Sequence, residues 1–321
     1  MTDDLTVLVG EYMAFRAARG FQPNPKVEHL LTQFVASLPQ SAPERGDGRL
    51  FTNGQALAWA HAPAGGSPAW LSDRLSAVRQ FAAFLAGSGL PVDVPAVRQG
   101  VGGSRRATPY LYTGADIRAL MSAADDLFTP LKAATLKTLT GLLAVTGMRI
   151  GEALRLTIGD LDLDEGVIVI TQAKYGRQRI VLLEATSRQA ITGYLHLPVR
   201  HRLGTTPERP VFVTFKGTAL AYRTAQGAFH QMTQRASLPA RAGARPRQHD
   251  LRHTFATQSM IDAYRQGRDP ARTLTLLSVW LGHANPADTY WYLQAAPEVA
   301  ALAALRLEPG LDDRVVESEE S

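Results

Sequence analysis

The hydrophobic pattern of this chain changes its period once, and that change limits the possible folds more than any other feature. Most of the sequence places apolar residues at the spacing of amphipathic helices. Residues 166–171 and 179–183 are instead β-rich runs that flank a short turn at residues 173–177, which is a hairpin signal. Residues 211–215 suggest a third strand. We therefore expect a mainly α-helical protein with a small antiparallel β-sheet.

Four segments differ in composition. They are a helical unit, a basic linker, a longer helical segment that holds the strands, and an acidic tail, at residues 1–97, 98–109, 110–307 and 308–321. Apolar spacing predicts helices at residues 5–21, 25–38, 72–85, 116–127, 130–145, 151–156, 186–195, 222–236, 249–264 and 271–281. A length of 321 residues with 45% hydrophobic content fits two domains.

The charge of the chain favours a polyanionic partner. The formal net charge is +5, and the last fourteen residues alone hold six acids and one arginine, so the rest is more basic than this total. Within the linker, Arg98, Arg105 and Arg106 lie along a DNA backbone or belong to a solvated basic linker. Composition alone leaves both interpretations open.

Several classes of protein are excluded. The chain has no cysteine, which rules out disulfides, thiolate nucleophiles and cysteine-ligated zinc. It has no apolar stretch long enough to cross a membrane, and its first residues lack the basic start and apolar core of a signal peptide. We expect a cytoplasmic protein without a membrane partner.

Two helix starts carry residues suited to binding a phosphate. Arg149 begins a predicted helix, and Glu152 lies on the same face, where it can brace the guanidinium. His249 and Arg252 also share a face, so a proton-exchanging ring and a planar donor can meet one phosphate. His253 points elsewhere and is expected to support the site. Taken alone, each pair also has an ordinary structural explanation as a surface ion pair or a structural histidine.

A lysine and a tyrosine complete the set. Only five of the 34 basic residues are lysines, and Lys174 stands at the predicted hairpin tip, where it is either a solvated turn residue or a proton donor, a role that arginine cannot fill. Near the C-terminus, His283 is followed by a turn and then by two tyrosines, Tyr290 and Tyr292. Two residues on a helix differ by about 200°, so only one of these phenols can face the site.

These residues, in this order, resemble the tyrosine recombinase family, which comprises phage integrases and Xer-type recombinases. Residues 146–152 (TGMRIGE) are similar to its first motif, residues 249–257 (HDLRHTFAT) to its second, and residues 281–283 (LGH), with a tyrosine nine residues later, to its nucleophile segment. Residues 106–112 and 289–293 are most similar to recombinases of recombinase-in-trio mobile elements. The resemblance selects Tyr292 over Tyr290.

The resemblance implies a two-domain clamp, with a helical core-binding domain and a catalytic domain, that cleaves and rejoins DNA through a 3′-phosphotyrosine without metal or cofactor. It implies these catalytic residues: Arg149, Lys174, His249, Arg252, His283 and Tyr292, supported by Glu152 and His253. We expect further DNA contacts from Arg98, Arg105, Arg106, Arg177, Arg179, Arg245 and Arg247. Arg177 and Arg179 depart from relatives, which often place lysine nearby.

The same resemblance implies the partners. They are double-stranded DNA of the nucleoid and further recombinase protomers, which assemble as a homo- or hetero-tetramer on two DNA sites and include sister recombinases of a mobile element. The apolar positions at residues 296, 299, 302 and 305 form a C-terminal helix that docks on a neighbouring protomer or packs on its own domain. A relaxing enzyme similar to type IB topoisomerases, and a non-catalytic accessory subunit, remain as alternatives.

Overall fold

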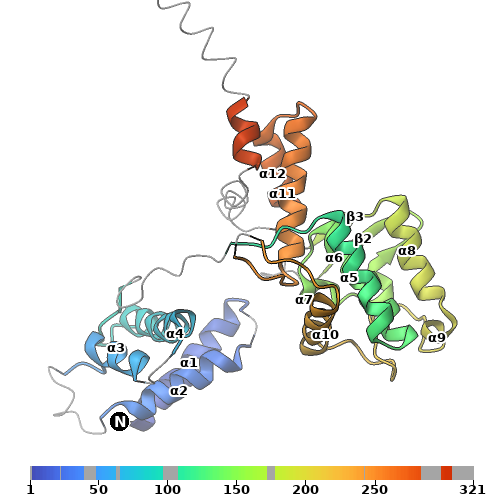
Figure 1. Ribbon diagram of the computed structural model, residues 1–321. Coiled ribbons are helices and arrows are strands. Elements are labelled where there is room, and N and C mark those ends of the chain that lie inside the picture. The colour runs from blue at the N-terminus through green and yellow to red at the C-terminus, as the bar shows by residue number, and fades with distance from the viewer. Residues whose placement is uncertain are drawn as a thin grey trace, which may run out of the picture. The chain divides into compact units, whose positions relative to one another are not determined.

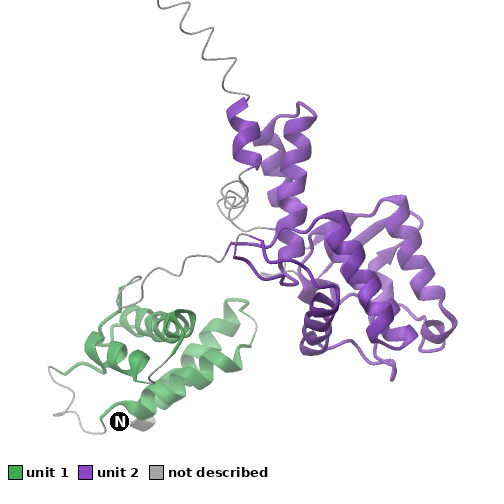
Figure 2. Ribbon diagram, in the orientation of Figure 1, with its two compact units in different colours: residues 1–106 green, residues 107–321 purple. Residues whose placement is uncertain are grey.

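The computed structural model describes residues 2–21, 23–39, 48–62, 66–96, 108–171, 178–241, 243–282 and 298–305. The chain separates into two compact units, residues 1–106 and 107–321, drawn in green and purple in Figure 2. Each unit has a hydrophobic core of its own. The predicted linker falls at the boundary between the units, and its residues 98–107 lie outside the described ranges.

The helices of the first unit begin where the sequence provides caps. They are α1 (Thr2–Ala18), α2 (Pro25–Ser37), α3 (Asn53–His61) and α4 (Pro68–Gly87). The side chains of Asn24 and Ser67 accept the backbone N–H groups of the first turns of α2 and α4, each of which has proline at its start. The sequence pattern did not predict α3, which begins with a capping box between Thr52 and Gln55.

Aromatic side chains fill the core of the first unit. Phe34 of α2 meets Phe51 and Trp59 edge-on, with ring centroids 4.9 and 5.2 Å apart. Phe81 of α4 is fully buried in the same cluster. Such large apolar side chains supply much of the free energy that stabilises a small helical unit.

The second unit alternates helices with a small sheet (Figure 1). Its elements are α5 (Gly114–Leu127), α6 (Pro130–Thr146), α7 (Ile150–Ala153), the 3-10 turn η2 (Ile158–Asp160), β1 (Leu161–Asp162), β2 (Val167–Ile170), β3 (Arg179–Leu182), α8 (Ala185–His196), α9 (Pro198–His201), α10 (Tyr222–Arg235), α11 (Asp250–Arg265) and α12 (Pro270–Leu281). The mainly helical fold class is confirmed. The boundaries of the predicted helices agree with the structure to within a few residues, whereas the short helix α9 was not predicted.

The sheet is antiparallel in the order β1-β2-β3. Ile168 of β2 pairs with Val181 of β3, and both are fully buried, whereas Ile180 is 58% exposed. Alternate residues therefore face the core, as the period of two requires. The predicted hairpin is confirmed for both strands, while residues 172–177 of its turn lie outside the described ranges.

The predicted third strand at residues 211–215 is wrong. Val211, Phe212 and Val213 are all buried, so they do not alternate between two faces. The segment folds back on itself, because Val213 forms a bridge with Ala219 and the N–H of Leu220 donates to the carbonyl of Phe212. The third strand of the sheet is the two-residue β1.

The C-terminal part of the second unit forms a separate cluster. Figure 1 shows α11, α12 and the helix at residues 298–305 together. Val299 is 2% exposed and belongs to the apolar cluster of α11 and α12, and Arg265 donates to Glu298 at 2.7 Å. Val299 and, in part, Leu302 therefore pack on their own unit, whereas Leu305 is 61% exposed. None of the helices in the described ranges is long and apolar enough to cross a membrane.

Candidate active site

Gly147 is the C-cap of α6, and its backbone conformation is one that favours glycine. Its φ is +62°, the left-handed region that disfavours other residues. A Cβ at this position would lie 2.4 Å from Cδ1 of Phe255 on α11 and 3.1 Å from Cδ2 of Leu281 on α12. Glycine thus lets three helices meet two residues before Arg149.

Arg149 is the N-cap of α7, and Glu152 holds it there. The backbone N–H of Arg149 donates to Oε2 of Glu152 at 2.8 Å, and its Nη1 donates to Oε1 at 3.0 Å. The Arg149 side chain remains 32% exposed, whereas that of Glu152 is 2% exposed. The predicted bracing of Arg149 by Glu152 is present, and the guanidinium keeps one side toward solvent.

Arg179 at the start of β3 binds the same carboxylate. Its Nη1 and Nη2 donate to the two oxygens of Glu152 at 3.0 and 2.7 Å, and its side chain is 9% exposed. Burial alone would raise the pKa of Glu152. The hydrogen bonds and charge of Arg179, followed by the backbone and guanidinium of Arg149, outweigh burial and lower this pKa to about 2. Arg179, expected on DNA, instead lies in a buried ion pair.

Arg252 of α11 is almost completely buried, with 2% of its surface exposed. Its Nη1 donates to the carbonyl oxygen of Gly147 and its Nη2 to that of Leu281, both at 2.8 Å. These carbonyls belong to the ends of α6 and α12, where orphan acceptors need partners. One side chain therefore joins α11 to the segment before Arg149 and to the segment before His283.

His249 precedes α11 and lies beside His253. Their ring centroids are 5.0 Å apart at an interplanar angle of 88°. His249 remains exposed, yet its surroundings lower its pKa, through desolvation first and then through the charge of Arg252, with a smaller opposing effect of Asp250 and smaller lowering effects of Arg149 and Arg247. The bond from Arg252 to Gly147 brings the segment of His249 and Arg252 next to the segment of Arg149.

A tyrosine after the linker anchors the start of α11. The backbone N–H of Tyr112 donates to Oγ1 of Thr254 at 2.9 Å, and its hydroxyl donates to the carbonyl of Arg247 at 3.0 Å. Arg247 also forms a bidentate pair with the fully buried Asp250. The position of His249 is thus set from both sides, by contacts that the sequence pattern did not reveal. Arg245 is exposed.

The last turn of α12 meets the same region. The indole N–H of Trp280 donates to the carbonyl of Thr146 at 2.8 Å. Gly282 has a φ of +67°, and a Cβ there would lie 3.0 Å from Nη1 of Arg179. The chain therefore leaves α12 in direct contact with the Arg179–Glu152 pair.

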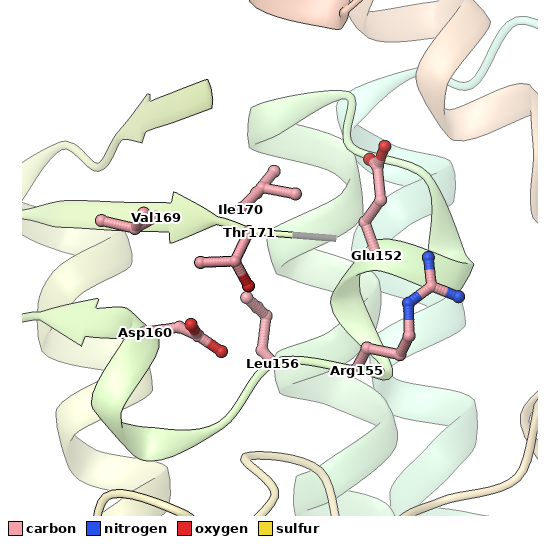
Figure 3. A pocket seen from close by; sticks show the side chains of 7 residues that line it. All are labelled: Glu152, Arg155, Leu156, Asp160, Val169, Ile170 and Thr171. Carbon is pink, nitrogen blue, oxygen red and sulfur yellow. The ribbon is translucent and has the colours of Figure 1, made fainter. Parts of the chain in front are cut away.

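A small hollow lies next to this pair (Figure 3). Side chains of α7 and the residues after it, of η2, and of the end of β2 and the residue after it line the hollow: Glu152, Arg155, Leu156, Asp160, Val169, Ile170 and Thr171. Its volume of about 10 Å³ is close to that of one water molecule. A nucleotide cannot enter this hollow. The described residues contain no cluster of three metal-ligating side chains.

Several candidates lie outside the described residues. They are Lys174, His283, Tyr292 and the rival Tyr290, together with Arg98, Arg105, Arg106 and Arg177. The described chain stops next to two of them, at Thr171 before the hairpin turn and at Gly282 before His283.

Comparisons with known proteins agree on one family. A family model described as the phage integrase family matches residues 111–298. The integrase/recombinase protein y4rB of Sinorhizobium fredii is 34% identical over 312 residues, which cover 95% of this chain and 98% of that protein.

Solved structures share the fold. The Tn1549 transposon integrase in complex with transposon right-end DNA has a TM-score of 0.66 at 18% identity and covers 95% of this chain and 98% of its own. A λ integrase tetramer bound to a Holliday junction has a TM-score of 0.65 at 16% identity and covers 90% of this chain and 76% of its own. At these identities the similarity establishes the architecture.

Proposed function

The chain belongs to the phage integrase family, and on that premise we propose that it is a site-specific recombinase that cleaves and rejoins duplex DNA through a phosphotyrosine on Tyr292. One observation carries the proposal. The segment of Arg149 contacts the segment of His249 and Arg252, because Arg252 donates a hydrogen bond to the carbonyl oxygen of Gly147. Such a group of cations and a titratable ring suits the phosphodiester of DNA.

Cleavage transfers the phosphoryl group from DNA to the enzyme. The Tyr292 oxygen attacks the phosphorus, and the bond to the 5′-oxygen breaks, which leaves a 3′-phosphotyrosine and a free 5′-hydroxyl. The phenol proton leaves toward His249, and Lys174 protonates the departing 5′-oxygen. Because the phosphodiester energy is kept in the new bond, the reverse reaction rejoins the strand.

The remaining groups stabilise the charge that develops on phosphorus. Arg149 and Arg252 are assigned to the non-bridging oxygens, with His283 as a further donor. Arg252 is 2% exposed, so this assignment requires the segments around it to open when DNA binds. Arg149 is supported in this role by its partial exposure, and Glu152 and His253 support the first turns of their helices. These protein cations supply the positive charge, so we expect cleavage to continue in EDTA.

We assign the first unit to DNA binding and the second to catalysis, with residues 98–109 connecting them along the duplex. Arg98, Arg105, Arg106, Arg177, Arg245 and Arg247 are proposed phosphate contacts. The protein acts as a tetramer of identical or sister protomers on two DNA sites. Family membership and the tetrameric λ relative support this assembly. Sedimentation of the protein on duplexes with one or two sites measures it.

The test is covalent capture of DNA. Wild-type protein is incubated with a pool of duplexes of randomised sequence, stopped with denaturing detergent, and the DNA that stays attached is sequenced. A selected duplex is then rebuilt with a nick just beyond the scissile phosphate, so that the short 5′-hydroxyl strand diffuses away. We expect an adduct from wild type and from Tyr290→Phe, and none from Tyr292→Phe. Adducts from the Tyr292 variant would refute the nucleophile.

The same assays separate the alternative functions. Relaxation of a supercoiled plasmid without exchange between two sites would favour a topoisomerase-like enzyme. Sequence-specific binding without any adduct from wild type would favour an accessory subunit. For Lys174, loss of the side chain should slow cleavage of ordinary DNA, and a 5′-thiolate leaving group, which needs no proton, should restore it.

A further inference from the structure

We propose that Arg179 is a positioning residue that occupies the Glu152 carboxylate and so keeps the guanidinium of Arg149 open toward DNA. The inference rests on the function proposed above. It replaces the DNA contact that the sequence suggested for Arg179. Three observations carry it: the division of Glu152 between two arginines, the unequal exposure of these arginines, and the contact of Arg179 with the end of α12.

Glu152 is shared unequally. Arg179 reaches both carboxylate oxygens with two nitrogens, at 3.0 and 2.7 Å, whereas the Arg149 side chain reaches one oxygen with one nitrogen, at 3.0 Å. A bidentate pair is the preferred arrangement of a guanidinium with a carboxylate. Arg179 therefore holds the position that Arg149, the N-cap of the helix that carries Glu152, would otherwise take.

The two arginines also differ in their access to solvent. The Arg149 side chain is 32% exposed, and that of Arg179 is 9% exposed. A phosphate can approach Arg149 without displacing Glu152, but it can reach Arg179 only by breaking a buried ion pair. Separating such a pair is costly, because it leaves a buried charge without its partner. Of the two arginines that bind Glu152, Arg149 is thus the one that DNA can reach, and Arg179 acts through Glu152.

Arg179 touches a third segment as well. Its side chain packs on Gly282, where an added Cβ would lie 3.0 Å from Nη1 and 3.3 Å from Cδ. Gly282 directly precedes His283 in the sequence. Arg179, at the start of β3, follows Lys174 by five positions. A single buried side chain therefore connects β3, α7 and the end of α12, each of which leads to a residue assigned to catalysis.

The pairing makes an unusual mutational prediction. Without Arg179, both carboxylate oxygens of Glu152 bind the guanidinium of Arg149. The N–H donors of Arg149 then point away from the phosphate. Removing the Glu152 charge in the same protein releases Arg149 again. The double variant Arg179→Gln with Glu152→Gln should therefore be less impaired than the product of the two single effects, which is the signature of residues that act on one another.

The experiment compares Arg179→Gln, Glu152→Gln, their double variant, Arg179→Lys and a control, Arg188→Gln. Arg188 lies on α8 in the same unit and donates to the exposed carbonyl of Asp164, so its loss changes the charge equally. Single-turnover cleavage of the selected nicked duplex is measured with oxygen and sulfur leaving groups. DNA affinity is measured against salt concentration, and thermal unfolding checks that each variant folds.

We expect Arg179→Gln to slow cleavage about a hundredfold, the scale of a misplaced active-site group. Arg179→Lys should keep part of the rate, and Arg188→Gln all of it. The sulfur leaving group should not restore the rate, because protonation by Lys174 is not the missing step. The salt slope should equal that of wild type, since a lost phosphate contact would reduce it by about 0.9.

A reduced salt slope with normal cleavage would return Arg179 to DNA binding and overturn the proposal. The proposal would also be overturned if the loss of cleavage rate in the double variant equalled the product of the losses in the two single variants. If Arg179→Gln does not fold, Arg179→Lys takes its place. Its cleavage rate is then compared with that of wild type, on substrates with the oxygen and with the sulfur leaving group. A wild-type protein that forms no adduct refutes the proposed recombinase instead. In that case the Glu152 carboxyl is titrated by NMR in the protein without DNA. If the pKa of Glu152 is the same in the Arg179→Gln variant as in wild type, the pairing of Arg179 with Glu152 is refuted.

Discussion

Arg252 donates a hydrogen bond to the carbonyl oxygen of Gly147 at 2.8 Å, across 105 positions of sequence. The bond joins the two segments that carry the proposed phosphate-binding arginines, because Gly147 stands two residues before Arg149. A second bond from Arg252 to Leu281 brings in the segment before His283. The three parts of the site therefore depend on one buried guanidinium, and the backbone geometry around it should control both stability and cleavage.

Gly147→Ala should destabilise the protein by more than 2 kcal/mol, a rough sum of the left-handed φ and a Cβ placed 2.4 Å from Phe255. Urea unfolding measures the change. Gly193→Ala is the matched control, since this glycine lies inside α8 with nothing within 4 Å of its Cβ position. The free energy of unfolding of the Gly193→Ala variant should rise by up to about 1 kcal/mol, because alanine favours a helix interior more than glycine does. Equal effects in the two variants would contradict this account of Gly147.

Tyr112→Phe should cost about 1 kcal/mol, because the carbonyl of Arg247 loses its hydroxyl donor in a part-buried position. Since this bond fixes the approach to α11, cleavage should slow as well. Denaturant midpoints and single-turnover rates give both effects. Tyr222→Phe, whose residue is 51% exposed, is the control. A Tyr112 variant with wild-type cleavage would show that the start of α11 is held without this hydroxyl.

The pKa of His249 is lowered by desolvation and by Arg252, so the folded protein binds a proton at this ring more weakly than the unfolded chain. The imidazole should therefore stay neutral through neutral pH, and the cleavage rate should fall only below the ordinary pKa of histidine. His249→Gln should remove that fall. A pH–rate profile of both proteins tests this. A decline centred above the ordinary value would show that the ring is stabilised in its charged form.

Glu152 has a pKa lowered from 4.5 to about 2. A depressed carboxyl pKa contributes stability above the unfolded value, and this contribution is lost as pH falls from about 4.5 toward 2. It amounts to a few kcal/mol in order of magnitude. Glu152→Gln should lower stability at neutral pH and flatten its acid dependence in denaturant titrations. Asp125→Asn, in an exposed pair with Lys137, should leave the curve nearly unchanged.

The sequence pattern predicted those helices and strands that are determined by residues close together in the chain. Helices with apolar spacing and caps, and the β2–β3 hairpin, lie where the sequence placed them. Two predictions were incomplete or wrong for different reasons. The helix α3 lies in a stretch with weak apolar periodicity and is recognisable only by its Thr52–Gln55 cap. Residues 211–215 have strand-like composition, but Phe212 and Val213 pair with residues 219 and 220 of the same loop and not with the sheet.

The sequence by itself determined the family, the order of the proposed catalytic residues and the pairing of Arg149 with Glu152, because each depends on residue type and short-range spacing. Only the tertiary structure decided that Arg179 binds Glu152 instead of facing solvent, and that Arg252 joins Gly147 to Leu281. Both outcomes depend on contacts between segments that are distant in sequence. Burial then makes Arg179 the close partner of Glu152 while Arg149 stays accessible, and no local pattern carries that information.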